Sequence, residues 1–333
     1  MSARIGRRGL LLGGTALGAS LLLLSKRRED DSYPGGPSRT FGARPLPPPK
    51  DPPAISAHAR LSFFALGDTG WQTDAKAAVA AAMAKQAGTA GLDLVLLLGD
   101  NFYRDGIAST RDERWRTHFE EAFAAPELQV PFFAALGNHD HNGNVQAQVE
   151  YSAQSERWRM PGQYFEFTRS ITHACEVQFC VLDTTTMRLD SFAADEQVRW
   201  LEEKLANSTA RWKVVVGHHP LVSGGDHGGS SNVRDRIEPL LVEHGVYLYL
   251  SGHDHDLQLL ESGHRYLQVV SGAGSMTRDV RWMDETLYAE AEPGFASFLL
   301  TEAELWIQFF TASQGSRYCK HLEREVRLTD ARR

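Results

Sequence analysis

Leu136-Gly137-Asn138-His139-Asp140-His141 begins at the last residue of an apolar run, residues 131–136. Such a run is typical of a buried strand. Gly137 allows the chain to turn sharply, because glycine has no Cβ atom. An amide, two imidazoles and a carboxylate then follow without a spacer. Open α/β sheets bind ligands beyond the carboxyl ends of their strands, so we expect this hexad to lie at a functional edge.

Other apolar runs in the chain end in the same way, with a glycine and then Asp or His. A single Gly-Asp pair is an ordinary turn, but the repetition indicates polar side chains that converge at one sheet edge. Burying these groups together without a cation would be costly. Asp, His, Asn and Tyr donors suit Fe, Zn or Mn, and a carboxylate can bridge two ions in sites that hydrolyse phosphoesters. The segments in question are Gly67-Asp68, Gly99-Asp100-Asn101, Gly217-His218-His219 and Gly252-His253-Asp254-His255.

The order of apolar runs and amphipathic stretches predicts an α/β fold. We expect strands at residues 61–66, 92–98, 131–136, 177–182, 213–216, 246–250 and 266–270, and a late hairpin at 295–300 and 305–311. We expect helices at residues 74–87, 110–123, 195–205 and 234–244.

The charge of the chain is uneven along its length. Of its 35 basic residues, 29 lie outside residues 1–28, against 42 acidic ones, so the body is strongly acidic. This composition argues against a nucleic-acid binder, and an anionic substrate would need positive charge supplied locally. The three cysteines are too few for a disulfide scaffold, although one bridge is possible, and Cys180 lies in an apolar run typical of a core.

The N-terminal region divides into two segments before the expected domain. Arg7-Arg8 precedes an apolar run at residues 10–24, which favours a twin-arginine signal peptide and an exported protein, periplasmic or secreted. The alternative is an uncleaved membrane anchor, because basic residues follow the run. Residues 29–58 are rich in Pro and Gly and are interpreted as an extended linker. The folded domain is expected at residues 59–325.

The motifs around Asp68, Asp100–Tyr103, Asn138-His139, Gly217-His218 and Gly252–His255 resemble those of the calcineurin-like metallophosphoesterases. Within that superfamily the chain is similar to the small, tartrate-resistant purple acid phosphatases, from about residue 61 to about residue 275. The resemblance implies a four-layer αββα sandwich with two mixed β-sheets. It also implies small phosphorylated substrates, and we expect a monomer.

The resemblance also implies roles for individual residues. His139 and His227 would contact phosphate, although His227 could instead be an ordinary loop histidine. Tyr103 would replace an imidazole that generic members place at the position of Gly70; the alternative is a packed aromatic ring. Asp68, Asp100, Tyr103 and His255 would hold Fe(III), with Asp100 bridging, and Asn138, His218 and His253 would complete a site for divalent Fe, Zn or Mn.

The implied reaction is hydrolysis of phosphomonoesters by a metal-bound hydroxide. Two alternatives remain open: a phosphodiesterase or nucleotide hydrolase on the same scaffold, and an exported iron-binding or redox protein. The chain departs from the animal enzymes at Arg188 and Asn232, where those carry a disulfide. It also has only a short segment, residues 183–195, where those carry a longer repressive loop, so we expect no need for proteolytic activation.

Overall fold

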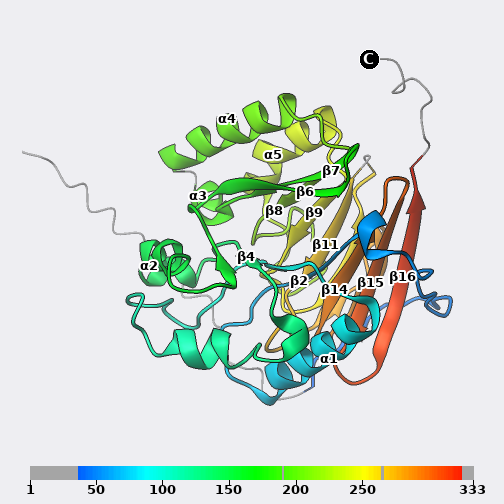
Figure 1. Cartoon of the computed structure of the whole chain (residues 1–333), viewed down its shortest axis with the longest axis horizontal. Coiled ribbons are helices and arrows are strands. Elements are labelled where there is room, and N and C mark those ends of the chain that lie inside the picture. The colour runs from blue at the N-terminus through cyan, green and yellow to red at the C-terminus, as the bar shows by residue number, and fades with distance from the viewer. Residues whose placement is uncertain (1–36, 190, 264–265, 325–333) are drawn as a thin grey trace, which may run out of the picture. The chain divides into compact units, whose positions relative to one another are not determined.

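The structure, a computed structural model, describes residues 37–189, 191–263 and 266–324. The expected signal or anchor at residues 1–28 lies outside this part. Within it, the chain forms two seven-stranded mixed sheets and one small two-stranded sheet. Helices cover the outer faces of the two large sheets (Figure 1). The expected α/β sandwich with two mixed sheets is thereby confirmed.

The first sheet combines parallel strands with an antiparallel extension. β2 to β5 are parallel, and β14 pairs with the other edge of β2 in the antiparallel sense. The expected late hairpin is present as β14 and β15, and β16 extends it. In spatial order the strands are β16 (Gly315–Glu323), β15 (Glu304–Thr311), β14 (Gly294–Leu300), β2 (Leu61–Leu66), β3 (Leu94–Leu97), β4 (Phe132–Ala134) and β5 (Trp158–Arg159).

The second sheet has a parallel centre flanked by antiparallel strands. β7, β8, β9 and β11 are parallel, whereas β6 and β10 pair in the antiparallel sense at the two sides. In spatial order the strands are β13 (Thr286–Glu290), β10 (Leu257–Glu261), β11 (Leu267–Ser271), β9 (Leu248–Ser251), β8 (Trp212–Val216), β7 (Cys175–Val181) and β6 (Phe165–Thr172).

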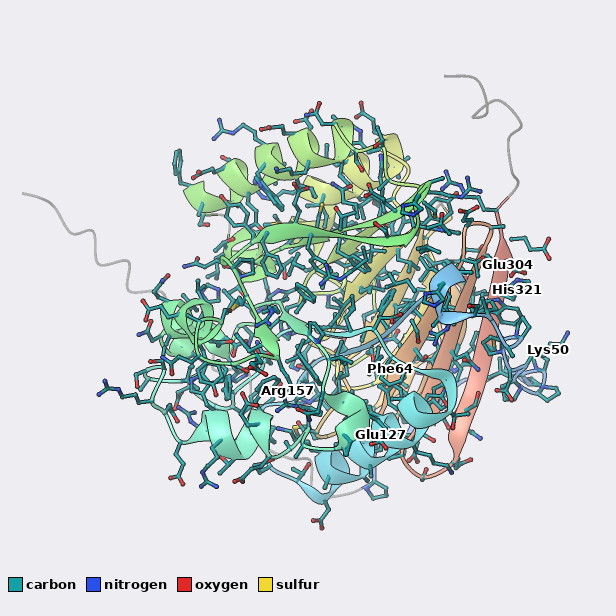
Figure 2. The ribbon with its side chains drawn as sticks, in the orientation of Figure 1. Lys50, Phe64, Glu127, Arg157, Glu304 and His321 are labelled. Atoms are coloured by element: carbon teal, nitrogen blue, oxygen red, sulfur yellow. The ribbon has the colours of Figure 1, made fainter. Side chains whose placement is uncertain are left out.

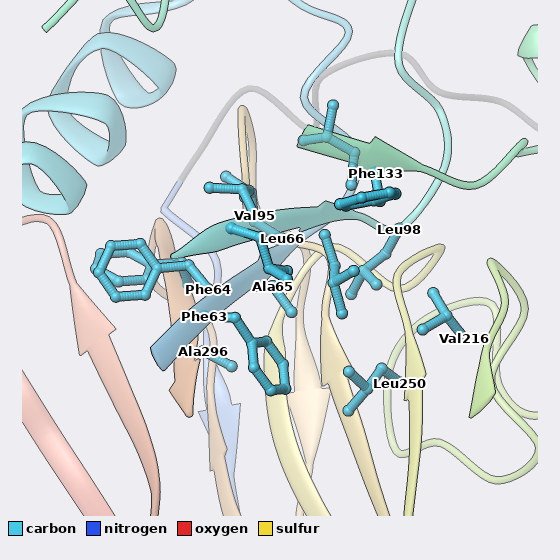
Figure 3. Packing of buried hydrophobic residues seen from close by; sticks show 14 of the residues in the cluster. Phe63, Phe64, Ala65, Leu66, Val95, Leu98, Phe133, Val216, Leu250 and Ala296 are labelled. Carbon is cyan, nitrogen blue, oxygen red and sulfur yellow. The ribbon is translucent and has the colours of Figure 1, made fainter. Parts of the chain in front are cut away.

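The main core lies between the two sheets. Phe63 on β2 meets Phe179 on β7 edge to face at 5.3 Å between ring centroids, and it stacks on Phe298 at 4.6 Å. Its neighbour Phe64 points to the other face of the sheet, toward the side of α1 (Asp74–Ala90) (Figure 3). Both faces of β2 are therefore buried, which explains why its sequence is a continuous apolar run.

Helices on the second sheet enclose a separate apolar cluster. α3 (Thr184–Arg188), α4 (Phe192–Ala206) and α5 (Ser231–Glu243) pack against one another and against strand residues such as Val215 and Tyr249. The remaining regular helix, α2 (Val145–Tyr151), follows the hexad. Short 3-10 turns occur at Ala57–Ala59, Pro126–Leu128 and Asp140–Asn142.

Two local expectations differ from the structure. The expected helix at residues 110–123 is only the short π-helix Trp115–Glu120, in which Trp115 stacks on Tyr151 at 3.6 Å. Part of the expected linker belongs to the folded unit, because β1 (Thr40–Phe41) pairs with β12 (Val280–Arg281) and Arg39 forms an ion pair with Asp279. Within the described residues, no helix is long and apolar enough to cross a membrane.

Candidate metal centre

The predicted ligands lie at the carboxyl ends of parallel strands, where the two sheets meet. Asp68 follows β2, Asp100 follows β3 and His253 follows β9, and these three have φ angles of 59°, 51° and 69°. Residues other than glycine rarely adopt this left-handed backbone conformation, so the surrounding structure must hold these three residues in place. Gly99 is needed nearby, since a Cβ atom there would lie 2.6 Å from Nδ1 of His218.

A first group of donor atoms surrounds the phenolic oxygen of Tyr103. This oxygen lies 2.9 Å from Oδ1 of Asp68, 3.0 Å from Oδ2 of Asp100 and 3.1 Å from Nε2 of His255. The same nitrogen of His255 lies 3.3 Å from Oδ1 of Asp68. A phenol has one proton and can donate it to only one of the two carboxylates. The arrangement is therefore poorly explained by hydrogen bonding alone.

A second group surrounds Nε2 of His218. This nitrogen lies 3.1 Å from Oδ1 of Asn138, 3.2 Å from Nδ1 of His253 and 3.4 Å from Oδ2 of Asp100. Nδ1 of His218 lies 2.8 Å from the carbonyl of Leu98 and is placed to donate its proton there, which leaves Nε2 with a lone pair for a ligand. Oδ2 of Asp100 belongs to both groups.

The other oxygen of each carboxylate is held by the backbone. The N–H of His253 donates to Oδ2 of Asp68 at 2.9 Å, and the N–H of His139 donates to Oδ1 of Asp100 at 2.9 Å. Burial alone would raise the pKa of Asp100, but the nearby imidazoles of His218 and His139 lower it below its usual range. Each carboxylate is thus oriented with one oxygen toward the donor groups.

Both groups fit a bound cation. Ligand atoms that sit ~2.1 Å from one ion are about 3 Å from one another, which matches the separations in each group. Asp68, Asp100, His218 and His255 are almost fully buried, so a cation would offset the cost of bringing two carboxylates out of water. The oxygen and nitrogen donors suit first-row transition metals. The structure therefore brings together every residue predicted as a ligand.

The two predicted phosphate-contacting histidines border this centre. The ring of His139 lies edge-on to Tyr103 at 4.6 Å, and its Nδ1 is 2.6 Å from the carbonyl of Arg104. The ring of His227 stacks on His253 at 4.6 Å, and its backbone N–H donates to Oδ1 of Asp254 at 2.7 Å. Both histidines are therefore adjacent to the donor groups, one on the loops of each sheet.

Several supporting residues could not be assigned from sequence. Oδ2 of Asp140 accepts hydrogen bonds from the backbone of Gly137 and Asn101, and Gln148 donates to its Oδ1 at 2.8 Å. Burial, and then the charge of Asp100, raise the pKa of Asp140 to about 6. Asp140 belongs to the hexad, so the sequence indicated only that it lies near the predicted ligands. Its hydrogen bond with Gln148 depends on the position of α2, which no sequence motif indicated.

A second supporting contact joins the two sheets. Nε2 of His141, which follows β4, lies 3.0 Å from both carboxylate oxygens of Asp183, which follows β7. The hydroxyl of Thr184 contacts Nδ1 of His219 at 2.9 Å and accepts from the backbone N–H of His218. His219 also lies close to two of the predicted ligands, because its ligand atom and those of His218 and His253 are near one another.

Arg188 and Asn232 contact each other. The side-chain amide of Asn232 donates to the backbone carbonyl of Arg188 at 3.0 Å, so a hydrogen bond joins these two positions. All three cysteines are free, and burial raises the pKa of Cys180 to about 12. Glu304 and His321 lie on β15 and β16, at one edge of the first sheet (Figure 2), and form a separate group with Glu323.

The chain is similar in sequence and in fold to several known proteins. The sequence model of the calcineurin-like phosphoesterases matches residues 61–257. Tartrate-resistant acid phosphatase type 5 of Sus scrofa is 33% identical over 299 residues, which cover 80% of this chain and 88% of that protein. Purple acid phosphatase 17 of Arabidopsis thaliana is 33% identical over 65% of this chain and 68% of its own length. A solved structure, GAP50, described as the anchor in the inner membrane complex of Plasmodium, superposes with a TM-score of 0.74 at 25% identity, covering 81% of this chain and 91% of its own.

Proposed function

Because the chain belongs to the calcineurin-like phosphoesterase family, and within it to the tartrate-resistant purple acid phosphatases, we propose that it hydrolyses phosphomonoesters at a dinuclear Fe(III)–M(II) centre. M is Fe, Zn or Mn. Hydrolysis of phosphoesters with a metal centre is the chemistry of this family; the ester class, the two ions and the role of each residue are the proposal.

One observation supports a pair of ions above all others. Oδ2 of Asp100 lies 3.0 Å from the phenolic oxygen of Tyr103 and 3.4 Å from Nε2 of His218, so it is shared by the two donor groups. A carboxylate oxygen in this position is suited to bridging two cations. The group that contains Tyr103 is the one suited to Fe(III), because a phenolate is a hard anionic ligand.

When bound, the two ions would supply an activated water molecule and neutralise the charge of the phosphate. The protein residues then orient the phosphate so that water attacks phosphorus opposite the leaving oxygen. The phosphorus–oxygen bond to the leaving group breaks, and the departing alkoxide needs a proton. This reaction requires no covalent nucleophile from the chain.

His139 and His227 are placed to serve the phosphate and the leaving group. Since Nδ1 of His139 is directed to the carbonyl of Arg104, its Nε2 is the nitrogen suited to the substrate. Asp254 holds the backbone of His227, and the stacking on His253 keeps the ring near the second donor group. We assign to these two histidines the orientation of phosphate and the protonation of the leaving alkoxide. We further propose that residues 1–28 direct export of the protein.

The test compares p-nitrophenyl phosphate with bis(p-nitrophenyl) phosphate as substrates of the metal-loaded protein. We expect faster turnover of the monoester, with activity retained at acid pH. Preference for the diester would instead favour a phosphodiesterase.

The His139→Ala variant addresses the iron-binding or redox alternative. We expect it to keep its metals and to lose most of its turnover. A variant that lost hydrolysis but kept physiological function would support the alternative.

A further inference from the structure

We propose that Arg104 determines substrate specificity by binding a second phosphate group, separate from the one that is hydrolysed. This inference rests on the proposed function. It assigns to the site a substrate class, small molecules with two phosphate groups, that neither the family match nor the relatives' names specify.

Arg104 is tied to the metal centre through its own backbone. It directly follows Tyr103, and its carbonyl lies 2.6 Å from Nδ1 of His139, the histidine assigned to phosphate. Any movement of this segment would therefore disturb both the first donor group and His139. The backbone of Arg104 is consequently fixed beside the position where the reacting phosphate would bind.

The side chain of Arg104 is held by an aromatic contact. Its guanidinium carbon lies 5.4 Å from the ring centroid of Trp71, and Trp71 stacks on Tyr103 at 5.3 Å with an angle of 18° between the ring planes. A cation over an indole ring is stabilised by the electrons of the ring. The guanidinium is therefore connected to Tyr103 through a single intervening ring, that of Trp71.

The guanidinium of Arg104 has the properties of an anion-binding group. Arg104 is exposed, and among the described residues no carboxylate forms an ion pair with it. By contrast, Arg114 and Arg116 are each paired with an acidic side chain. A guanidinium can donate two parallel hydrogen bonds to phosphate, and in an acidic protein such a cation would attract the more highly charged substrate.

The test compares two sugar phosphates that differ only in a second phosphate group. The ratio of kcat/KM for fructose 1,6-bisphosphate to that for fructose 6-phosphate is measured for the wild type, Arg104→Met and Arg104→Lys. We expect Arg104→Met to lower this ratio about tenfold, as for loss of one charge-assisted pair, and Arg104→Lys to lower it less. Higher ionic strength should reduce the difference between the variants.

Arg324→Met is the matched control. Arg324 also lies over aromatic rings, 5.6 Å from that of Trp212 and 4.9 Å from that of Tyr247. Trp212 begins β8, whose opposite end leads to His218, so this variant removes a similar cation far from the centre. The ratio should stay at its wild-type value. An unchanged ratio in Arg104→Met, or an equal loss of the ratio in Arg324→Met, would overturn the assignment.

A binding measurement separates this inference from the proposed function. The affinity of methylenediphosphonate relative to methylphosphonate is measured by calorimetry on the metal-loaded wild type and on Arg104→Met. If the wild type hydrolyses neither sugar phosphate but Arg104→Met still loses the preference for the diphosphonate, the proposed function fails and this inference holds. If the wild type is active and both preferences are unchanged in the variant, this inference fails alone.

Discussion

The phenolic oxygen of Tyr103 lies 3.0 Å from Oδ2 of Asp100, the atom shared by the two donor groups. If Tyr103 binds Fe(III) as a phenolate, replacing it with phenylalanine removes the source of tyrosinate-to-iron absorption. We expect Tyr103→Phe to lose the visible band and to retain less iron. The band should persist in Tyr151→Phe, whose hydroxyl donates to Glu120 outside the donor groups. A band that survived in Tyr103→Phe would show that another residue is the source.

Asp100→Asn should release both ions, because one oxygen of Asp100 faces both donor groups. We expect the metal content after dialysis to fall from about two ions per chain to near zero, together with phosphatase activity. Asp93→Asn is the control. Asp93 precedes β3 and accepts a hydrogen bond from the backbone N–H of Ser62 near the start of β2, at the opposite end of these strands from Asp100. Retention of both ions by Asp100→Asn would be incompatible with a bridging role.

The contact between His141 and Asp183 should make stability depend on pH. Burial opposes the charged imidazole, but Asp183 outweighs it and raises the pKa of His141 above its unfolded value. The stabilisation is therefore fully present below the unfolded pKa of about 6.5 and is lost as pH rises through the folded pKa. His141→Gln should destabilise the protein more at pH 6 than at pH 9 in urea unfolding. An equal or opposite difference would argue against a charged pair.

Lys76 should produce a pH dependence of the opposite sign. Burial in α1 lowers its pKa from 10.5 to about 7, although its ammonium group donates to the carbonyl of His118 at 2.6 Å. Between these two values the unfolded chain binds more protons, so wild-type stability rises with pH by up to ~1.4 kcal/mol per pH unit. The stability of Lys76→Met relative to the wild type should therefore be greatest near pH 6.5 and decrease toward pH 9.5. A constant difference in unfolding free energy would show that Lys76 is not desolvated.

The ligand set could be predicted because each member stands at the end of an apolar run. Asp68 and Asp100 follow β2 and β3 of the first sheet, whereas His218 follows β8 of the second sheet. The expectation of a single sheet edge was therefore wrong: the donors meet where the carboxyl ends of parallel strands from two sheets face each other. The sequence contained no comparable signal for the contact of His141 with Asp183, which depends on how the two sheets face each other. The same holds for Arg104, whose position depends on the ring of Trp71.

The secondary structure was predicted best where strands are buried on both faces. β2, at Leu61–Leu66, has the expected bounds, since an unbroken apolar run leaves little ambiguity. β6, at Phe165–Thr172, was missed because it is an edge strand with few buried residues and therefore lacks a continuous apolar run. The stretch that includes Trp115 has helical periodicity, but its large aromatic contacts with Tyr151 and Trp158 accompany a short π-helix instead.

The central claim is that the residues at the facing strand ends bind two transition-metal ions, one of them through Tyr103. The most direct measurement is metal analysis combined with a visible absorption spectrum of the purified protein. The account predicts about two ions per chain, including iron, and a broad charge-transfer band in the visible region. A protein that remained colourless and bound no stoichiometric metal after incubation with iron and zinc salts would contradict it.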